Sequence, residues 1–388
     1  MLRRQWIGFT AAAIAGAWQN DKAPAASDTV IAGATQDATP RVGVVLSSFS
    51  GSEDHDGAKL KGLRNPVSPE APANDKLLDE IVRDAIELGA TSRGGLSGIV
   101  RQRDWVVIKP HIAVCQRTDG SCIAGSVTDL RVVRSVIEWL AEHRLGSRIS
   151  IAEIPSWAMG PTFDVWESDW DGAFGGTSYR GMVEELGRRH PSIRFDIVDL
   201  AGDETTAVQP PGRFSVSPRT PAVYNVPATL LDCDNLITVA PLSTSSWTEV
   251  SLTLGSYLGA LPSARRERLR EKTPGPGDLD DLLVDLYSIR PADYAILGGE
   301  WGLEGDGPYG PDADPVHHTL ILGGASAVAV DAVGAAVMGF DPSGIKHLEL
   351  AARRGFGVVN TDSVWTRGNE IDEAKRPFRP AAELRSGD

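Results

Sequence analysis

Residues 105–111 read Trp105-Val106-Val107-Ile108-Lys109-Pro110-His111, a short apolar run that ends in a lysine, a proline and a histidine. A continuous apolar run of this length is typical of a strand that is buried on both faces. Such strands occur in parallel sheets whose two faces are covered by helices. The stretch therefore predicts an α/β fold in which polar residues follow the end of a buried strand.

The rest of the chain repeats this pattern of apolar strands and amphipathic helices. A stripe of apolar residues at Leu77, Leu78, Ile81, Val82 and Ile86 predicts a helix with Asn74 or Asp75 as its cap. The alternation predicts a mostly parallel sheet flanked by helices on both faces, built as one domain or as two intimately packed lobes. We expect strands at 41–46, 105–108, 148–154, 195–198, 235–240, 294–297 and 319–322, and helices at 75–88, 130–140, 179–189, 278–288, 326–338 and 345–354.

Composition and charge limit the classes of function. A chain of 388 residues with 41% hydrophobic and 23% charged residues is long and apolar enough to bury a large core. The formal net charge of −14 argues against nucleic acid as a partner, because there is no basic stripe to neutralise phosphates. One basic run, residues 265–272, alternates with acids and favours a solvated helix face over an anion contact.

The N-terminus has the features of an export signal. Arg3 and Arg4 precede a mild apolar run from Trp6 to Ala17, which is too short to span a bilayer. Paired arginines with a weakly hydrophobic run favour the twin-arginine (Tat) route over a Sec signal or a different start site. We expect a signal peptide at residues 1–25 and a disordered linker at 26–40. The Tat translocase would be a partner during export, and the mature protein would be periplasmic or extracellular with no stable membrane anchor.

The chain has three cysteines, Cys115, Cys122 and Cys233, and none of them form a CxxC pair. An iron–sulfur cluster held by four cysteines of this chain is therefore excluded. An oxidising destination would permit a disulfide between Cys115 and Cys122, which leaves Cys233 as a buried thiol.

Polar residues recur where the predicted strands end. Lys109 and His111 follow the strand at 105–108, where they could bind an anion or serve as base and ligand; alternatively, Lys109 only extends out of the sheet. Glu153 lies in the apolar strand at 148–154, where a carboxylate needs a cation, a metal or hydrogen-bond donors. Asp331 is the single charge of an apolar helix, which indicates either a structural salt bridge or a catalytic role.

Two loops add further candidates. The glycine-rich stretch 302–310 carries Glu304 and Asp306 and follows Glu300 and Trp301, so it could line a site or simply form a tight connection. The hydroxyl-rich stretch 243–249 could hold an oxyanion through Thr244 and Ser245 beside Trp247, or it could start a helix.

These candidates predict one cleft, which would lie between Lys109, Thr244, Glu304 and His318. Trp247 and Trp301 would exclude water from it. His111, Glu300, Glu304 and His318 would suit a divalent metal such as zinc, manganese or iron, although no spacing such as HExxH supports a metal and the cofactor is unknown. Because adjacent residues of a strand point to opposite faces, only one of His317 and His318 can face the cleft.

Several motifs in this order resemble one known family. They are Val107-Ile108-Lys109-Pro110, Thr128-Asp129-Leu130, Glu153, Asp234-Asn235-Leu236-Ile237, Gly302-Leu303-Glu304-Gly305-Asp306-Gly307-Pro308 and Ala329-Val330-Asp331-Ala332-Val333. Together they resemble the domain of unknown function 362 family over residues 41–358, which leaves residues 359–388 as a C-terminal tail. The resemblance implies the fold and fits a Tat signal, but the family has no settled general activity.

The sequence also departs from the family. A Lys-Thr-His triplet and a Lys-Asn pair are usual where this chain has Ser243-Thr244-Ser245 and Gly255-Ser256. These departures remove positive charge and a ligand from the expected cleft. Two hypotheses follow. One is an exported enzyme in which Lys109 positions a small anion, His111 acts as acid, base or ligand, and Glu153, Glu304 and Asp331 arrange protons or a metal. The other is a non-catalytic exported binding or assembly protein that uses the same cleft.

Overall fold

The computed structural model describes residues 39–54, 56–90, 94–112, 123–154, 176–211, 220–261, 278–308, 310 and 312–382. Contacts between these residues place them all in one compact unit, which spans Ala32–Asp388. The predicted signal peptide and most of the predicted linker lie outside the described residues, as do Cys115, Cys122 and the basic run at 265–272. No helix in the described part of the chain is long and apolar enough to cross a membrane.

One sheet forms the centre of this unit. Its main path has the order β14-β1-β13-β12-β9-β4-β5-β6. The strands along this path are β14 (Trp365–Gly368), β1 (Arg41–Leu46), β13 (Asp314–Gly324), β12 (Tyr294–Glu304), β9 (Asn235–Ala240), β4 (Trp105–Pro110), β5 (Arg148–Glu153) and β6 (Arg194–Asp199). Strand β13 is antiparallel to both of its neighbours, β1 and β12. All the other neighbouring strands along this path are parallel to each other. This confirms the predicted mostly parallel α/β fold.

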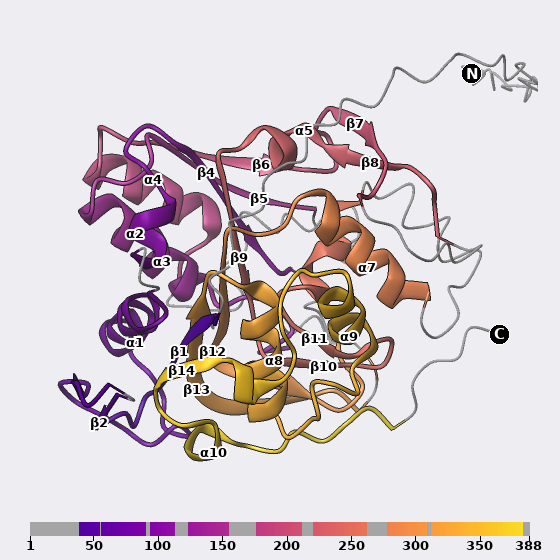
Figure 1. Cartoon of the computed structure of the whole chain (residues 1–388). Helices are drawn as coiled ribbons and strands as arrows, with labels where there is room; N and C mark the ends of the chain where they lie inside the picture. Colours follow the sequence, from indigo (N-terminus) through magenta and orange to yellow (C-terminus); the bar gives the residue numbers. More distant parts are fainter. Residues whose placement is uncertain are drawn as a thin grey trace, which may run out of the picture. The chain divides into compact units, whose positions relative to one another are not determined.

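The helices cover the two faces of the sheet in two groups (Figure 1). Helices α1 (Asp75–Leu88), α3 (Leu130–Glu142) and α4 (Tyr179–Arg189) pack on one face, and their apolar residues share one core cluster. Helices α7 (Asp278–Ile289), α8 (Ala327–Val337) and α9 (Lys346–Arg353) pack on the other face around a second cluster.

The change of face defines a topological switch point between β4 and β9. After β4, the chain passes through α3 on one face of the sheet and returns as β5, which pairs with one edge of β4. Strand β9 pairs with the other edge of β4, and the chain after β9 passes through α7 on the opposite face of the sheet. In open α/β sheets, ligands bind outside the carboxyl ends of the strands at such a point. A ligand site is therefore expected among the residues that follow β4 and β9.

Local sequence signals explain the helix ends. The side chain of Asn74 accepts a hydrogen bond from the Leu77 amide and caps α1. Asp129 and Ser178 cap α3 and α4 in the same way, by accepting from Arg131 and Gly181. Each cap satisfies an amide that the helix itself leaves without a partner.

The glycine-rich stretch was predicted as a loop after a strand that ends at Leu297, and this was wrong at its beginning. Strand β12 continues through Gly302 to Glu304 and forms a long antiparallel pair with β13. Gly298 has a positive φ of 118°, and a Cβ on it would lie 2.0 Å from the carbonyl oxygen of Leu320. A continuous strand is possible there because glycine permits both the angle and the close approach.

The remaining elements are short, and the sequence did not predict them. They are β2 (Gly51–Glu53), β3 (Lys59–Lys61), α2 (Gly95–Ile99), β7 (Thr205–Val208), β8 (Tyr224–Pro227), α5 (Ala228–Asp232), β10 (Ser243–Ser245), β11 (Glu249–Ser251), the 3₁₀ helices η3 (Gly255–Ala260) and η4 (Thr361–Ser363), and α10 (Ile371–Ala374). Strands β2 and β3 form a separate hairpin, and β10 extends the central sheet beside the end of β12. Strand β14 pairs with β1, so the region predicted as a C-terminal tail contributes a strand to the central sheet.

Candidate functional site

A buried ion pair lies at the carboxyl ends of β4 and β5. The ammonium group of Lys109 contacts the carboxylate of Glu153 and donates a hydrogen bond to the backbone carbonyl of Ser256 (2.8 Å). Lys109 is 0% and Glu153 2% exposed, so both charges have lost their contact with bulk water. Desolvation of two charges is costly unless good geometry and additional hydrogen bonds compensate for it. The carbonyl of Ser256 supplies one such hydrogen bond.

The 3₁₀ helix η3 covers this pair. A Cβ on Gly259 would lie only 2.3 Å from a carboxylate oxygen of Glu153, so the backbone of η3 rests directly on the acid. The Ser256 carbonyl that binds Lys109 belongs to the same short helix. Gly259 therefore allows the close approach of the η3 backbone to the charge of Glu153.

Asp331 holds the segment that leads into η3. Its Oδ1 accepts hydrogen bonds from the Thr253 amide (2.9 Å) and hydroxyl (2.6 Å), and its Oδ2 accepts one from the Leu254 amide (2.8 Å). Burial raises the pKa of Asp331 to about 6, although these hydrogen bonds oppose the shift. Since the carboxylate is 0% exposed and bonded to backbone, we assign it a structural role in placing η3 above Lys109.

His111 follows β4 at the switch point. Its amide donates to the carbonyl of Val239 in β9 (3.0 Å) and to the hydroxyl of Thr128 (2.8 Å), which fixes the start of the loop. The residue as a whole is partly exposed, although its imidazole is packed within the protein. Burial and the nearby charge of Lys109 lower the pKa of His111 to about 3. The imidazole is therefore neutral at physiological pH and can accept or donate a hydrogen bond, according to its tautomer.

Tyr179, at the start of α4, connects this ion pair to a second cluster. Burial, followed by the negative charges of Asp129 and Glu153, raises its pKa above the ordinary value, so the phenol stays protonated. Tyr179 could not be predicted from the sequence, because an aromatic residue at the start of a predicted helix gives no sign that two acids lie nearby.

The second cluster surrounds Glu300. The guanidinium of Arg131 binds both Glu300 and Asp129, and it also donates to the carbonyl of Ala73 (2.9 Å). His317 Nε2 lies 3.1 Å from Glu300 Oε1. The ring of His317 stacks on Trp301 with 4.3 Å between centroids, so this aromatic pair covers the cluster. Arg131 was not predicted from the sequence, because nothing in a helix stripe reveals an inward-facing guanidinium.

Glu304 and Asp306 bind the C-terminal segment of the chain. Glu304 accepts a hydrogen bond from the Arg379 amide (3.0 Å), and Asp306 accepts one from the Ala382 amide (2.9 Å). A guanidinium nitrogen of Arg379 also lies 3.6 Å from Glu304. The acids predicted for catalysis and substrate binding in the glycine-rich stretch thus serve as anchors for residues 379–382.

The hydroxyl-rich stretch is also engaged locally. The Thr244 hydroxyl donates to the carbonyl of Gly305 (2.7 Å), and Thr244 is fully buried. The Ser245 hydroxyl accepts hydrogen bonds from the amides of Trp247 and Thr248 and so closes a turn. These contacts give Thr244 and Ser245 a structural explanation that needs no bound oxyanion.

The four residues predicted to bind a metal do not come together. His111 lies at the switch point, Glu300 lies in the Arg131 cluster, and Glu304 binds Arg379. The ring of His318 contacts the carbonyl of Ala374 (3.0 Å), and burial lowers its pKa. Among the described residues, no group of three or more histidine, cysteine, aspartate or glutamate side chains is placed to hold a metal ion. Cys233 is a buried free thiol whose pKa burial raises to about 11.

The family described as Domain of unknown function (DUF362) matches residues 106–336, which is more than half of the chain. The chain belongs to the DUF362 family. A search of the curated proteins found no match. Among solved structures, the chain is similar to the lactate racemase apoprotein from Thermoanaerobacterium thermosaccharolyticum, with 12% identity and a TM-score of 0.36. The similarity covers 69% of this chain, which spans 58% of the length of that protein.

The DUF362 match includes the Lys109–Glu153 pair and Asp331, which holds the segment that leads into η3. Within it, a neutral imidazole lies beside a buried ammonium–carboxylate pair at the switch point. The neutral ring of His111 can donate or accept a hydrogen bond at the switch point. The residues after Ala336, including Arg379 and Ala382, lie outside the match.

Proposed function

We propose that this protein is an exported α/β enzyme that acts on a small anionic molecule at the carboxyl ends of β4, β5 and β9. The observation that carries the proposal is the position of His111, which lies at the topological switch point next to the buried Lys109–Glu153 pair. The anionic character of the ligand rests on the sequence, where Lys109 follows the end of a strand; in the structure, the carboxylate of Glu153 neutralises that ammonium group.

Each residue has a distinct part in the proposal. His111 is neutral at physiological pH, and its low pKa makes it a weak base in the free protein; a bound anion would raise that pKa, so that the ring can accept a proton from the ligand as a general base and return it. Lys109 acts from within the protein: Glu153 and the Ser256 carbonyl hold its ammonium group in one position, and burial together with this charge keeps the neighbouring imidazole of His111 neutral. Asp331 acts indirectly, since it fixes the segment that carries the Ser256 carbonyl.

The test begins with a thermal-shift screen of small carboxylates and phosphates, followed by mass spectrometry of any ligand that stabilises the protein. We expect one such compound to be converted, and we expect the variant His111→Asn to lower the rate by about 10²-fold or more. Its dissociation constant should stay within about threefold of the wild-type value, because His111 is assigned proton transfer and not the main binding charge.

The matched control is His190→Asn. His190 is also partly buried and pairs with Glu138 (2.7 Å). It precedes β6, so it lies at the amino ends of the parallel strands, whereas His111 lies at their carboxyl ends. The His190→Asn variant should convert the compound at the wild-type rate. Conversion that persists in His111→Asn would refute the assignment of His111.

A second candidate function is a non-catalytic exported binding protein. The observation that favours it is the engagement of Glu304, Asp306 and Asp331 with backbone amides, which leaves fewer acids for chemistry. This function predicts that an anion binds to the protein and stabilises it, and that Lys109→Met raises the Kd for this anion. Mass spectrometry should detect no product even after long incubation.

Export is a separate part of the proposal, and it rests on Arg3, Arg4 and the short apolar run after them. Replacement of both arginines by lysine should retain the protein inside the cell, whereas the wild type should be recovered outside the inner membrane. Export of the double variant at the wild-type level would favour the Sec route instead.

A further inference from the structure

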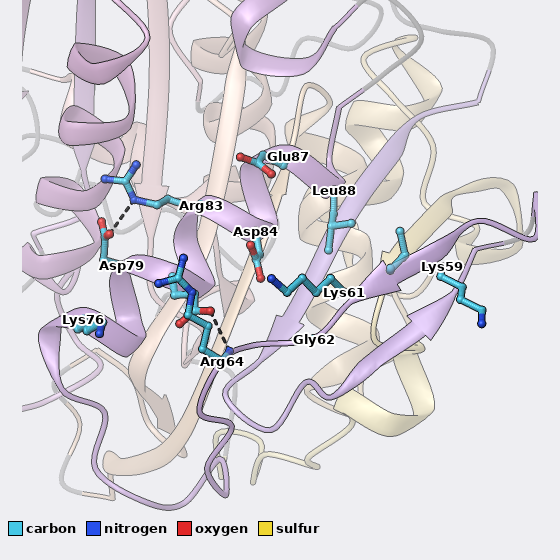
Figure 2. A pocket seen from close by; sticks show the side chains of 12 residues that line it. Lys59, Lys61, Gly62, Arg64, Lys76, Asp79, Arg83, Asp84, Glu87 and Leu88 are labelled. Atoms are coloured by element: carbon cyan, nitrogen blue, oxygen red, sulfur yellow. Dashed lines mark hydrogen bonds and ion pairs between the residues drawn. The ribbon is translucent and has the colours of Figure 1, made fainter.

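A hollow of about 550 Å³ lies between the β2–β3 hairpin and helix α1 (Figure 2). The hairpin side contributes Lys59, Leu60, Lys61, Gly62 and Arg64, and α1 contributes Lys76, Asp79, Glu80, Arg83, Asp84, Glu87 and Leu88. This volume is within the range of roughly 300–1,000 Å³ that small-molecule sites occupy. The hollow lies on the outer side of α1, apart from the Lys109–Glu153 pair.

Some of the lining charges neutralise one another. Arg83 donates to Asp79 (2.7 Å) and to Glu142 (2.7 Å), so these two carboxylates neutralise its guanidinium charge. Glu80 accepts a hydrogen bond from the backbone amide of Arg64 (2.9 Å), which ties the hairpin connection to α1. Figure 2 shows the contact between Arg83 and Asp79 as a dashed line. These pairs form the frame of the hollow.

The other cations are not neutralised in this way. The side chains of Lys59, Lys61, Arg64 and Lys76 make no ion pair within 4.0 Å with any residue that the structure describes. All four are exposed, and they line the hollow from two different elements, the hairpin and α1. They share the lining with the carboxylates of Glu80, Asp84 and Glu87, so the hollow has a net excess of one positive charge in a chain whose net charge is −14.

An acidic group faces these cations from α1. Asp84 is partly buried, and Lys61 extends toward it across the hollow (Figure 2). Burial, then the charges of Glu87 and Glu80 on α1, raises the pKa of Asp84 to about 6, and Lys61 opposes that shift. At neutral pH, Asp84 therefore offsets part of the positive charge, and below about pH 6 it no longer does.

We propose that the hollow between β3 and α1 binds a small molecule that carries two or more negative charges, with Lys61, Arg64 and Lys76 as its partners. A multivalent anion matches three cations converging from two elements, because each contact adds a charge-assisted hydrogen bond. The ligand class is that of phosphates and polycarboxylates. This site is separate from the proposed catalytic site and does not depend on it.

The experiment is a calorimetric titration of the purified protein with inorganic pyrophosphate and, in parallel, with citrate, at constant ionic strength. We expect saturable one-to-one binding of at least one of them. The double variant Lys61→Gln/Arg64→Gln should weaken it by about tenfold or more, because two of the three charge contacts are lost. The tighter of the two probes decides between the phosphate and carboxylate classes.

Two controls make the result specific. Lys346→Gln/Arg353→Gln removes two exposed cations from α9 on the opposite face of the sheet, and its affinity should stay within about twofold of the wild-type value. His111→Asn should also leave the affinity unchanged, which separates this site from the proposed catalytic one. The proposal fails if neither probe binds saturably, if the α9 variant weakens binding as much as the hairpin variant, or if His111→Asn abolishes binding.

The pH dependence provides an independent readout with a fully ionised probe, ethanedisulfonate, whose own charge is constant between pH 5 and 8. Binding should strengthen as the pH falls through about 6, since Asp84 then loses its negative charge beside Lys61 while Asp79, Glu80 and Glu87 remain as the other acids with which α1 lines the hollow. Asp84→Asn should bind more tightly at pH 7.5 and should show a flatter pH profile. An unchanged profile in Asp84→Asn would contradict the assignment of Asp84 to the site.

Discussion

At the scale of single residues, three buried acids in the described part of the chain each meet a specific partner from a distant stretch of sequence. Glu153 meets Lys109, Asp331 meets the amides of Thr253 and Leu254, and Glu300 meets Arg131. A buried carboxylate without such a partner would cost several kcal/mol, so these contacts are conditions for folding as well as for any chemistry. The distinction matters because a variant that loses activity can do so by unfolding.

The Lys109–Glu153 pair allows that distinction to be measured. Lys109→Met leaves a buried carboxylate without its cation and should lower the free energy of unfolding by about 3–5 kcal/mol. Adding Glu153→Leu removes the orphaned charge and should recover most of that loss. Urea unfolding of the two single variants and the double variant gives the coupling energy. Additive losses would mean that the two side chains do not depend on each other.

Asp331 gives a prediction about pH. Its pKa in the folded protein is about 6, whereas its ordinary value is 3.8, so the folded state binds the proton more tightly than the unfolded state. The stabilisation is therefore full below about pH 4 and is lost as the pH rises through about 6, with a maximum of about 3 kcal/mol.

Asp331→Ala should flatten that part of the stability profile. It should also destabilise the protein at pH 7 by about 2 kcal/mol or more, since the amides of Thr253 and Leu254 lose their acceptor. The measurement is the free energy of unfolding by urea at pH 4, 5, 6 and 7. A wild-type slope that persists in Asp331→Ala would assign it to other groups, of which Asp84 is the first to test.

At the scale of elements, the sequence predicted the central strands and their helices well because their apolar patterns are local. The predicted strands at 41–46 and 235–240 and the predicted helix at 179–189 coincide with β1, β9 and α4. The continuation of β12 through its glycines could not be predicted, because its pairing with β13 overrides the weak strand tendency of glycine.

The candidate site was less predictable than the elements, because partners depend on distant contacts. Lys109, His111 and Glu153 were selected because they stand at strand ends, and the structure does place them near the switch point. Glu304 was selected by the same reasoning, yet its partner is Arg379, which lies 75 residues later in the chain. A local pattern shows that a carboxylate needs a partner but does not identify which residue supplies it.

The glycines of the short elements give a prediction about η3. Gly259→Ala would place a Cβ 2.3 Å from a Glu153 oxygen, so η3 must shift away from the ion pair. We expect a loss of stability of about 1–3 kcal/mol, as for other overpacked core positions.

The matched control is Gly187→Ala in α4, where a Cβ meets nothing within 4 Å. Alanine should stabilise that helix by about 0.5–1 kcal/mol, since glycine is the poorer helix former. The two variants, compared by thermal unfolding, should therefore shift the melting temperature in opposite directions. A stabilised Gly259→Ala would show that η3 does not rest on Glu153.

At the scale of the whole molecule, the last part of the chain completes the sheet and closes over its end. Strand β14 pairs with β1, and the amide of Phe378 donates to the carbonyl of Met338 at the end of α8 (2.8 Å). The ring of Phe378 is 5% exposed and lies against Gly302, where a Cβ would come within 2.7 Å of it. The segment therefore joins α8 to the end of β12.

This arrangement predicts the effect of truncation. A chain that ends at Lys375 loses the burial of Phe378 and the contacts of Arg379 with Glu304, and it should lose about 3–5 kcal/mol of stability, as for the truncation of a buried phenylalanine. A chain that ends at Ala382 keeps every described contact and should unfold within about 0.5 kcal/mol of the full chain. Urea unfolding of the two truncated chains measures this difference. Equal stability of the two would mean that residues 376–382 contribute nothing to the fold, and the assignment of Glu304 and Asp306 as their anchors would be wrong.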